Sequence, residues 1–131
     1  ACFAVAGAWG AMAKAVSHRL GASFRVKGLE LVDRVFTVPL EPTGGARTID
    51  VFAREVRKAP KSFSPSAGPA APPPDAPWLV FLQGGPGGKA TRPTEASGWV
   101  KAAVDDGFRV LLLDQRGTGR STPADVAMLK R

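Results

Sequence analysis

Two apolar runs constrain the fold of this chain most strongly, because each ends abruptly in a glycine-rich loop. The first run, residues 78–82, leads into the sequence QGGPGG at 83–88, and the second, residues 108–113, leads into DQRGTGRS at 114–121. The runs are separated by about the length of one helix. This spacing predicts two neighbouring parallel strands whose carboxyl ends carry the loops, where open α/β sheets bind their ligands. We therefore expect function at these two loops.

The residues between the loops have the pattern of a short helix. Ser97 is suited to the N-cap position and Gly107 to the position after the last turn. Strand, loop, helix and strand make a βαβ unit, whose crossover is almost always right-handed. Because both strands are continuous apolar runs, we expect both of their faces to be covered.

An antiparallel hairpin is predicted upstream, within residues 28–58. Apolar and polar residues alternate over 29–40 and over 48–56, and the turn-forming sequence EPTGG separates the two runs. The following segment, residues 59–77, is rich in proline and has almost no apolar periodicity, which predicts a linker or surface insertion. Docking of SH3-like domains on its prolines is the functional alternative.

Residues 1–27 differ in composition from the rest of the chain and are predicted to be a leader. They contain no Asp or Glu, are rich in Ala and Gly, and gain basic residues toward their end. This composition is compatible with a transit peptide for a plastid or mitochondrion. A secretory signal with a cleavage site at AMA (11–13) is less favoured, and an ordinary helical extension of a cytoplasmic protein is the third interpretation. The uncharged opening is too short to span a bilayer, so no membrane partner is expected.

The charge balance and the glycine runs also bear on nucleotide partners. The net charge is +7, from 18 Lys and Arg against 11 Asp and Glu, but the basic residues are scattered, so no nucleic-acid partner is expected. A P-loop needs Gly where Gln83 stands and Ser or Thr where Ala90 stands. A G-x-G-x-x-G motif would have Ala90 in its third place, and Glu95 follows too closely to hold a ribose. The single cysteine, Cys2, excludes an internal disulfide.

The two loop sequences together resemble the α/β-hydrolase fold and, within it, the proline iminopeptidase family of serine peptidases. That family carries H-G-G-P-G after one strand and D-Q-R-G-x-G-x-S after the next. The second motif is matched from Asp114 to Ser121 without a gap, and the first departs only at Gln83, where His is commoner. The resemblance spans roughly residues 28 to 125. It implies the α/β class: the amino-terminal part of an α/β-hydrolase sheet, with an antiparallel opening hairpin, then a parallel βαβ unit, and residues 78–131 as the first part of an incomplete core.

The resemblance also implies a chemistry for the first loop. Hydrolysis of an amide by a serine needs a nucleophile, a base with its orienting acid, and donors for the oxyanion of the tetrahedral intermediate. In α/β-hydrolases one donor comes from the loop after the third strand, which makes the backbone N–H of Gly85 the first candidate and that of Gly84 the second. Glycine allows a positive φ and a close approach of the backbone to a substrate. The residues expected to support this loop are Gln83, Pro86, Gly87, Asp114, Arg116 and Gly117.

A catalytic triad is not apparent in this sequence. No serine has the G-x-S-x-G context of a nucleophile elbow, because Arg25 stands two residues after Ser23 and Pro123 two residues after Ser121. The only histidine, His18, precedes the predicted sheet. We therefore expect this chain, which begins with Ala, to be an inactive amino-terminal fragment of a longer enzyme, with Ser121 as a turn or capping residue.

The sequence thus predicts a serine-type, prolyl aminopeptidase-like hydrolase for the full-length parent. By resemblance, this enzyme would release an amino-terminal residue, often proline, from a peptide with a free amino terminus, through an acyl-enzyme and without a metal or cofactor. An esterase-like hydrolase on the same scaffold stays open. If the chain is complete, a non-catalytic binding module that acts through the proline-rich segment or a sheet edge is the interpretation. The sequence indicates no oligomeric state.

Overall fold

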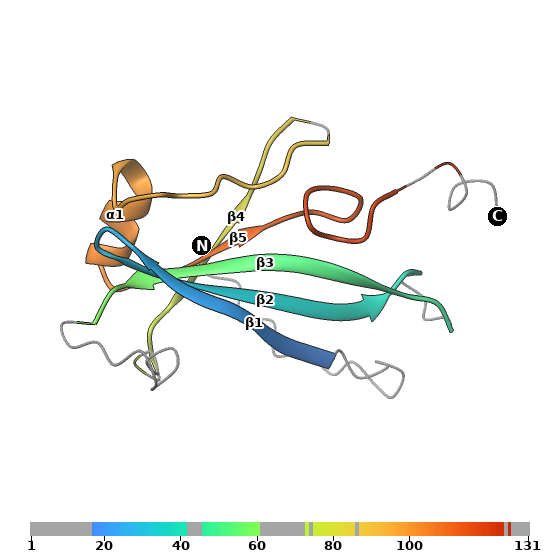
Figure 1. The fold of residues 1–131 in the computed structure, drawn as a ribbon, viewed down its shortest axis with the longest axis horizontal. Coiled ribbons are helices and arrows are strands. Elements are labelled where there is room, and N and C mark those ends of the chain that lie inside the picture. The colour runs from blue at the N-terminus through green and yellow to red at the C-terminus, as the bar shows by residue number, and fades with distance from the viewer. Residues whose placement is uncertain are drawn as a thin grey trace.

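A mixed sheet dominates the fold (Figure 1). A computed structural model describes residues 17–41, 46–60, 73, 75–85, 87–124 and 126. Among these residues, five strands form one sheet in the order β1-β2-β3-β5-β4, and one helix packs beside it. No helix in these ranges is long and apolar enough to cross a bilayer. The elements are β1 (Ser17–Val26), β2 (Leu29–Pro39), β3 (Thr48–Lys58), β4 (Trp78–Leu82), α1 (Gly98–Asp105) and β5 (Arg109–Leu113).

The predicted antiparallel hairpin is confirmed. Strands β2 and β3 pair antiparallel over their whole lengths, from Leu29 opposite Lys58 to Pro39 opposite Thr48. Residues 42–45 of the connection lie outside the described residues. The long, unbroken register fixes which side chains share a face, because alternate residues of a strand point to opposite faces.

Strand β1 was not predicted, and it corrects the extent of the leader. Residues 1–27 were expected to lie outside the sheet, whereas Ser17–Val26 pairs antiparallel with β2. The strand is mostly exposed, and a shift of register between Leu20 and Ser23 interrupts its alternation, so the sequence carries little period-two signal. The interpretation of the leader as a helical extension is therefore wrong for residues 17–26, which form this strand. A targeting role for residues 1–16, which lie outside the described residues, stays a prediction.

The predicted parallel βαβ unit is confirmed. Strands β4 and β5 pair in parallel, and α1 connects them. Ser97 is at the N-cap of α1, without a side-chain capping bond, and Gly107 follows the C-cap with a φ of 88°. Strand β5 also pairs antiparallel with β3, which joins the βαβ unit to the hairpin. The carboxyl ends of β4 and β5 therefore lie side by side, as the argument from the two loops requires.

Helix α1 covers one face of the sheet and forms the apolar core with it. Burial of the core side chains removes apolar surface from water, which stabilises the fold by about 25 cal/mol for each Å² buried. The buried members of this core are Leu29, Leu31, Val56, Ala90, Val100, Ala103, Val104, Val110 and Leu112.

The other face of β4 is bare, which differs from the expectation that both faces are covered. Trp78, Val80 and Leu82 are 45%, 53% and 58% exposed, while the alternating residues Leu79 and Phe81 pack against the core. Among the described strands β4 pairs with β5 alone, so it is an edge of the sheet. The apolar run therefore identified the strand but not its burial. Leu79 and Phe81 are only partly buried, and the opposite face is exposed apart from the Arg109 guanidinium over the Trp78 ring.

A buried carboxylate, Glu55, lies on the sheet face opposite α1. Its oxygens accept hydrogen bonds from Arg34 Nε at 2.7 Å and from Arg109 Nε at 2.9 Å, and Arg57 Nη1 lies 3.7 Å away. Burial is the largest single influence and would raise the pKa of Glu55, but the hydrogen bonds and positive charges of Arg109 and Arg34 together outweigh it and hold the pKa below its ordinary value. Arg109 also lies over the Trp78 ring, with 3.7 Å from its guanidinium carbon to the ring centre. This face thus has a charged centre in place of an apolar one.

Candidate functional site

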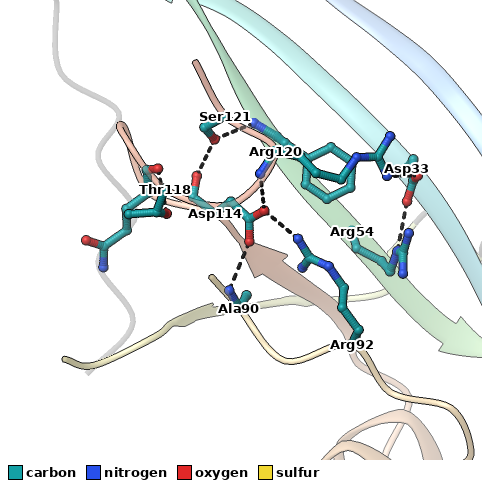
Figure 2. Close-up of polar contacts among 10 residues, drawn as sticks. Asp33, Arg54, Ala90, Arg92, Asp114, Thr118, Arg120 and Ser121 are labelled. Carbon is teal, nitrogen blue, oxygen red and sulfur yellow. Dashed lines mark hydrogen bonds and ion pairs between the residues drawn. The ribbon is translucent and has the colours of Figure 1, made fainter. Parts of the chain in front are cut away.

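Two loops meet at the carboxyl ends of β4 and β5. We call residues 83–90 the glycine loop and residues 114–121 the DQRG loop. Gln115 Nε2 donates to the backbone oxygen of Gln83 at 3.3 Å, and the backbone N–H of Ala90 donates to Asp114 Oδ1 at 2.9 Å. The two loops are therefore in direct contact, and Figure 2 shows the bond between Ala90 and Asp114.

Asp114 is the centre of this contact. Its side chain is fully buried and accepts three hydrogen bonds: from the Ala90 backbone N–H, from the Arg120 backbone N–H at 2.9 Å, and from Arg92 Nη2. Hydrogen bonds to a buried carboxylate are charge-assisted and are stronger than neutral ones. One side chain thus holds the end of the glycine loop, the turn of the DQRG loop and a cation together.

Ser121 fastens the DQRG loop to β3. Its hydroxyl donates to the backbone oxygen of Asp114 at 2.7 Å and accepts from the backbone N–H of Phe52 at 2.9 Å. The backbone N–H of Asp114 in turn donates to the Phe52 oxygen at 3.0 Å. Ser121 is 3% exposed, and its hydroxyl is engaged on both sides. The backbone N–H of Ser121 donates to the Thr118 oxygen at 3.0 Å, as expected for a turn residue.

The glycine loop offers its backbone to open space. Gly84, Gly85 and Gly87 are exposed, and a Cβ built on any of them would meet no atom within 4 Å. Gly85 and Gly87 have φ values of 86° and 84°, which glycine adopts at little cost. The N–H groups of Gly84 and Gly85 have no acceptor among the described residues. Both groups are therefore free to donate to a ligand.

The other predicted supporting residues divide between the loops. Gln83 Nε2 donates to the Gly84 oxygen at 3.1 Å, and Gly117 adopts a φ of 81° and donates its N–H to the Thr122 oxygen at 3.1 Å. Arg116 Nη1 donates to the Leu40 oxygen at 2.8 Å, so it ties the DQRG loop to the end of β2. Pro86 lies outside the described residues.

Sequence reasoning missed the cations of this site. Arg92 follows the glycine loop by two residues and pairs with Asp114, and its guanidinium carbon lies 5.1 Å from the centre of the Phe52 ring. Arg92 Nη1 is buried and has no hydrogen-bond acceptor among the described residues. Arg54 and Arg120 lie over the same ring, at 6.0 and 4.1 Å. No local pattern marks these arginines, because their partners are far away in the sequence.

Asp33 of β2 forms a second carboxylate centre beneath the loops (Figure 2). It accepts from Arg54 Nε at 2.8 Å and from Arg120 Nη1 at 2.6 Å. Burial is the largest single influence and would raise the pKa of Asp33, but the hydrogen bonds and positive charges of Arg54 and Arg120 together outweigh it and hold the pKa below its ordinary value. Asp33 and Arg54 of the hairpin are thus connected to the DQRG loop through Arg120.

The lowered pKa values of Asp33 and Glu55 predict acid sensitivity. A group whose folded pKa is lowered contributes stability that is present above its unfolded pKa and is lost as the pH falls through the folded pKa. We therefore expect the free energy of unfolding to decline as the pH falls below the ordinary values of 4.5 for Glu55 and 3.8 for Asp33. Urea unfolding at a series of pH values measures this decline, and Asp33→Asn should remove part of it. Equal stability at about pH 6 and about pH 3 would contradict the prediction.

An open cavity of about 600 Å³ adjoins the DQRG loop on the sheet face opposite α1. Apolar side chains of the sheet form its floor, and Gln115 and Arg116 form its rim. Within the described ranges, no group of three or more His, Cys, Asp or Glu side chains is placed to ligate a metal ion. The residues that line the cavity are Phe36, Val38, Val51, Leu113, Gln115 and Arg116.

Comparison with known proteins connects this arrangement to one family of enzymes. No protein-family model matches the chain. A proline iminopeptidase of Aeromonas sobria is 40% identical over 104 residues, which are 78% of this chain and 22% of that protein. Proline iminopeptidase aneH of Aspergillus aculeatus is 48% identical over 50 residues, which are 38% of this chain and 11% of that protein. The chain therefore spans less than a quarter of the length of either relative. Over the residues that align, the chain is similar to proteins named proline iminopeptidase, which supports a relationship to that family.

Proposed function

We propose that this chain is the amino-terminal part of an α/β-hydrolase that acts as an aminopeptidase, and that its glycine loop supplies donors to the oxyanion of the acyl-transfer step. The observation that carries the proposal is the pair of free N–H groups at Gly84 and Gly85, on a loop whose far end is fixed by Asp114. The names of the relatives favour an aminopeptidase over an esterase. A peptide with a free amino terminus is the proposed substrate, and proline is the residue that the names suggest.

In this mechanism the loop acts on the transition state. When a nucleophile adds to the scissile carbonyl, the oxygen gains negative charge, and preorganised N–H donors stabilise that charge without further reorganisation. The positive φ of Gly85 and the empty space around it allow an N–H to approach the reacting oxygen. We propose that the nucleophile, base and acid come from parts of the full-length protein that this sequence does not contain.

The bare face of β4 supports the same proposal. Parallel strands belong to sheets that are covered on both faces, whereas Trp78, Val80 and Leu82 are exposed here. The long relatives have ample additional chain to supply such a cover. A small binding module that acts through this edge is the alternative, and it would fold cooperatively and remain monomeric as the 131 residues alone.

The first experiment is to read the open reading frame downstream of Arg131 and to express its product, which we call the full-length protein. Continuation into G-x-S-x-G, followed by an acid and a histidine, is expected. A stop codon directly after Arg131 would contradict the proposed catalysis and favour the binding module.

Gly85→Pro in the full-length protein then tests the donor. Proline removes the N–H and cannot adopt the φ of 86°, so kcat for an aminoacyl amide should fall about 10²- to 10³-fold. Gly85→Ala is the matched control, because alanine keeps the N–H and its Cβ meets open space, so its cost is the backbone strain of about 1 to 2 kcal/mol at a φ of 86°. It should lose much less activity than the proline variant. Equal activity of Gly85→Pro and the wild type would exclude Gly85 as the donor.

A further inference from the structure

Arg120 connects two buried carboxylates that come from different parts of the chain. Its backbone N–H donates to Asp114 Oδ2 at 2.9 Å, while its Nη1 donates to Asp33 Oδ2 at 2.6 Å. The side chains of Asp33 and Asp114 are 3% and 0% exposed, whereas that of Arg120 is 56% exposed. An exposed residue therefore bridges the hairpin and the DQRG loop (Figure 2).

The two ends of this bridge hold different structures. At one end, Asp114 also binds the Ala90 N–H and thereby the glycine loop. At the other end, Asp33 also binds Arg54 Nε, so it is fixed to β3 as well as carried by β2. Between the ends, the guanidinium carbon of Arg120 lies 4.1 Å from the centre of the Phe52 ring. Stacking on an aromatic face restricts the guanidinium to one orientation.

We propose that Arg120 is a positioning residue, whose guanidinium locks the DQRG loop to the hairpin and so fixes where the glycine loop places its donors. The proposal rests on the proposed function of the glycine loop. It assigns to Arg120 a role that neither the motif nor the loop contacts alone indicate. Loss of the guanidinium removes the link between the DQRG loop and Asp33. Ser121 and Arg116 still hold that loop to β3 and to the end of β2. We therefore expect the turn at Arg120, and with it the Asp114 carboxylate that binds Ala90, to gain freedom.

Substitutions of Arg120 can remove its side-chain bond to Asp33 while keeping its backbone bond to Asp114. Arg120→Met keeps the backbone N–H to Asp114 and a side chain of similar length, but it removes the link to Asp33. Arg120→Lys keeps the charge without the planar fork that bonds and stacks at the same time. Because the side chain is more than half exposed, neither change creates a core cavity. Arg19→Met is the control, since it removes an exposed arginine paired with Asp50 elsewhere on the hairpin.

Two readouts on the full-length protein test the proposal. Hydrogen exchange measures whether the Ala90 amide stays protected, and steady-state kinetics with an aminoacyl amide measure kcat and KM separately. We expect Arg120→Met to speed exchange at Ala90 about tenfold and to lower kcat about tenfold or more with little change in KM, because displaced donors act only in the transition state. Arg120→Lys should recover part of both losses, and Arg19→Met should change neither.

Unchanged exchange at Ala90 in Arg120→Met would overturn the proposal, whatever happens to activity. A rise in KM alone, with kcat preserved, would overturn it as well, since it would show a role in binding substrate. If the wild-type protein hydrolyses no aminoacyl amide, the proposed function fails by itself. In that case the exchange at Ala90 still confirms or overturns the positioning of the loop by Arg120.

Discussion

Glu55→Gln is expected to lower the free energy of unfolding by about 3 to 5 kcal/mol, which is the cost of removing one partner from a buried ion pair. Glu55 is fully buried and balances Arg34 and Arg109, with Arg57 3.7 Å away. Glutamine has nearly the same shape, so the change removes the charge without leaving a cavity. The guanidinium groups of Arg34, Arg109 and Arg57 would then repel one another. Among the described residues, Glu30, the partner of Arg57, is the other carboxylate of this cluster. Urea unfolding of the full-length protein measures the loss.

Glu41→Gln is the matched control for this prediction. Glu41 also pairs with an arginine, Arg47, but both side chains are substantially exposed. Exposed pairs contribute about 0 to 1 kcal/mol, so the same chemical change should have little effect there. Similar losses in the two variants would show that burial of the Glu55 cluster does not govern its energetics.

The βαβ unit could be predicted from the sequence because every signal for it is local. The apolar run of β5, the capping position of Ser97 and the glycine after α1 each specify a strand or helix end within a few residues. The same holds for the contact between the two loops, since parallel neighbouring strands must end at the same edge of the sheet. Local pattern and topology were therefore sufficient to predict that the two loops meet at one edge of the sheet.

The supports of the site could not be predicted because they depend on pairs that are distant in sequence. Asp114 and Arg116 were both expected to support the glycine loop, but the cationic partner of Asp114 is Arg92, and Arg116 bonds the Leu40 backbone. Nothing in the spacing distinguishes these two arginines. Strand β1 is a similar case. Its residues are mostly exposed and show no alternation, and the strand forms by pairing with the edge of β2.

Gly119→Ala should destabilise the protein by about 3 kcal/mol or more, because it combines a backbone cost with a steric one. Gly119 has a φ of 55°, where an alanine costs about 1 to 2 kcal/mol. A Cβ at this position would overlap the Asp114 carboxylate and lie 2.8 Å from the Cβ of Lys89. Asp114 would have to move and weaken its bonds to Ala90 and Arg120, and charge-assisted bonds contribute about 1.5 to 3 kcal/mol each.

Gly98→Ala separates the two costs, because Gly98 has nearly the same φ, 53°, with no atom within 4 Å of an added Cβ. It should therefore show the backbone cost alone, about 1 to 2 kcal/mol. The difference between the two variants, measured by urea unfolding, then reports how tightly the DQRG loop packs on Asp114 and the glycine loop. Equal losses of unfolding free energy in the two variants would show that the residues around Gly119 adjust to the added Cβ at no energetic cost. In that case the glycine loop would not be held rigidly enough by Asp114 to preorganise its N–H donors.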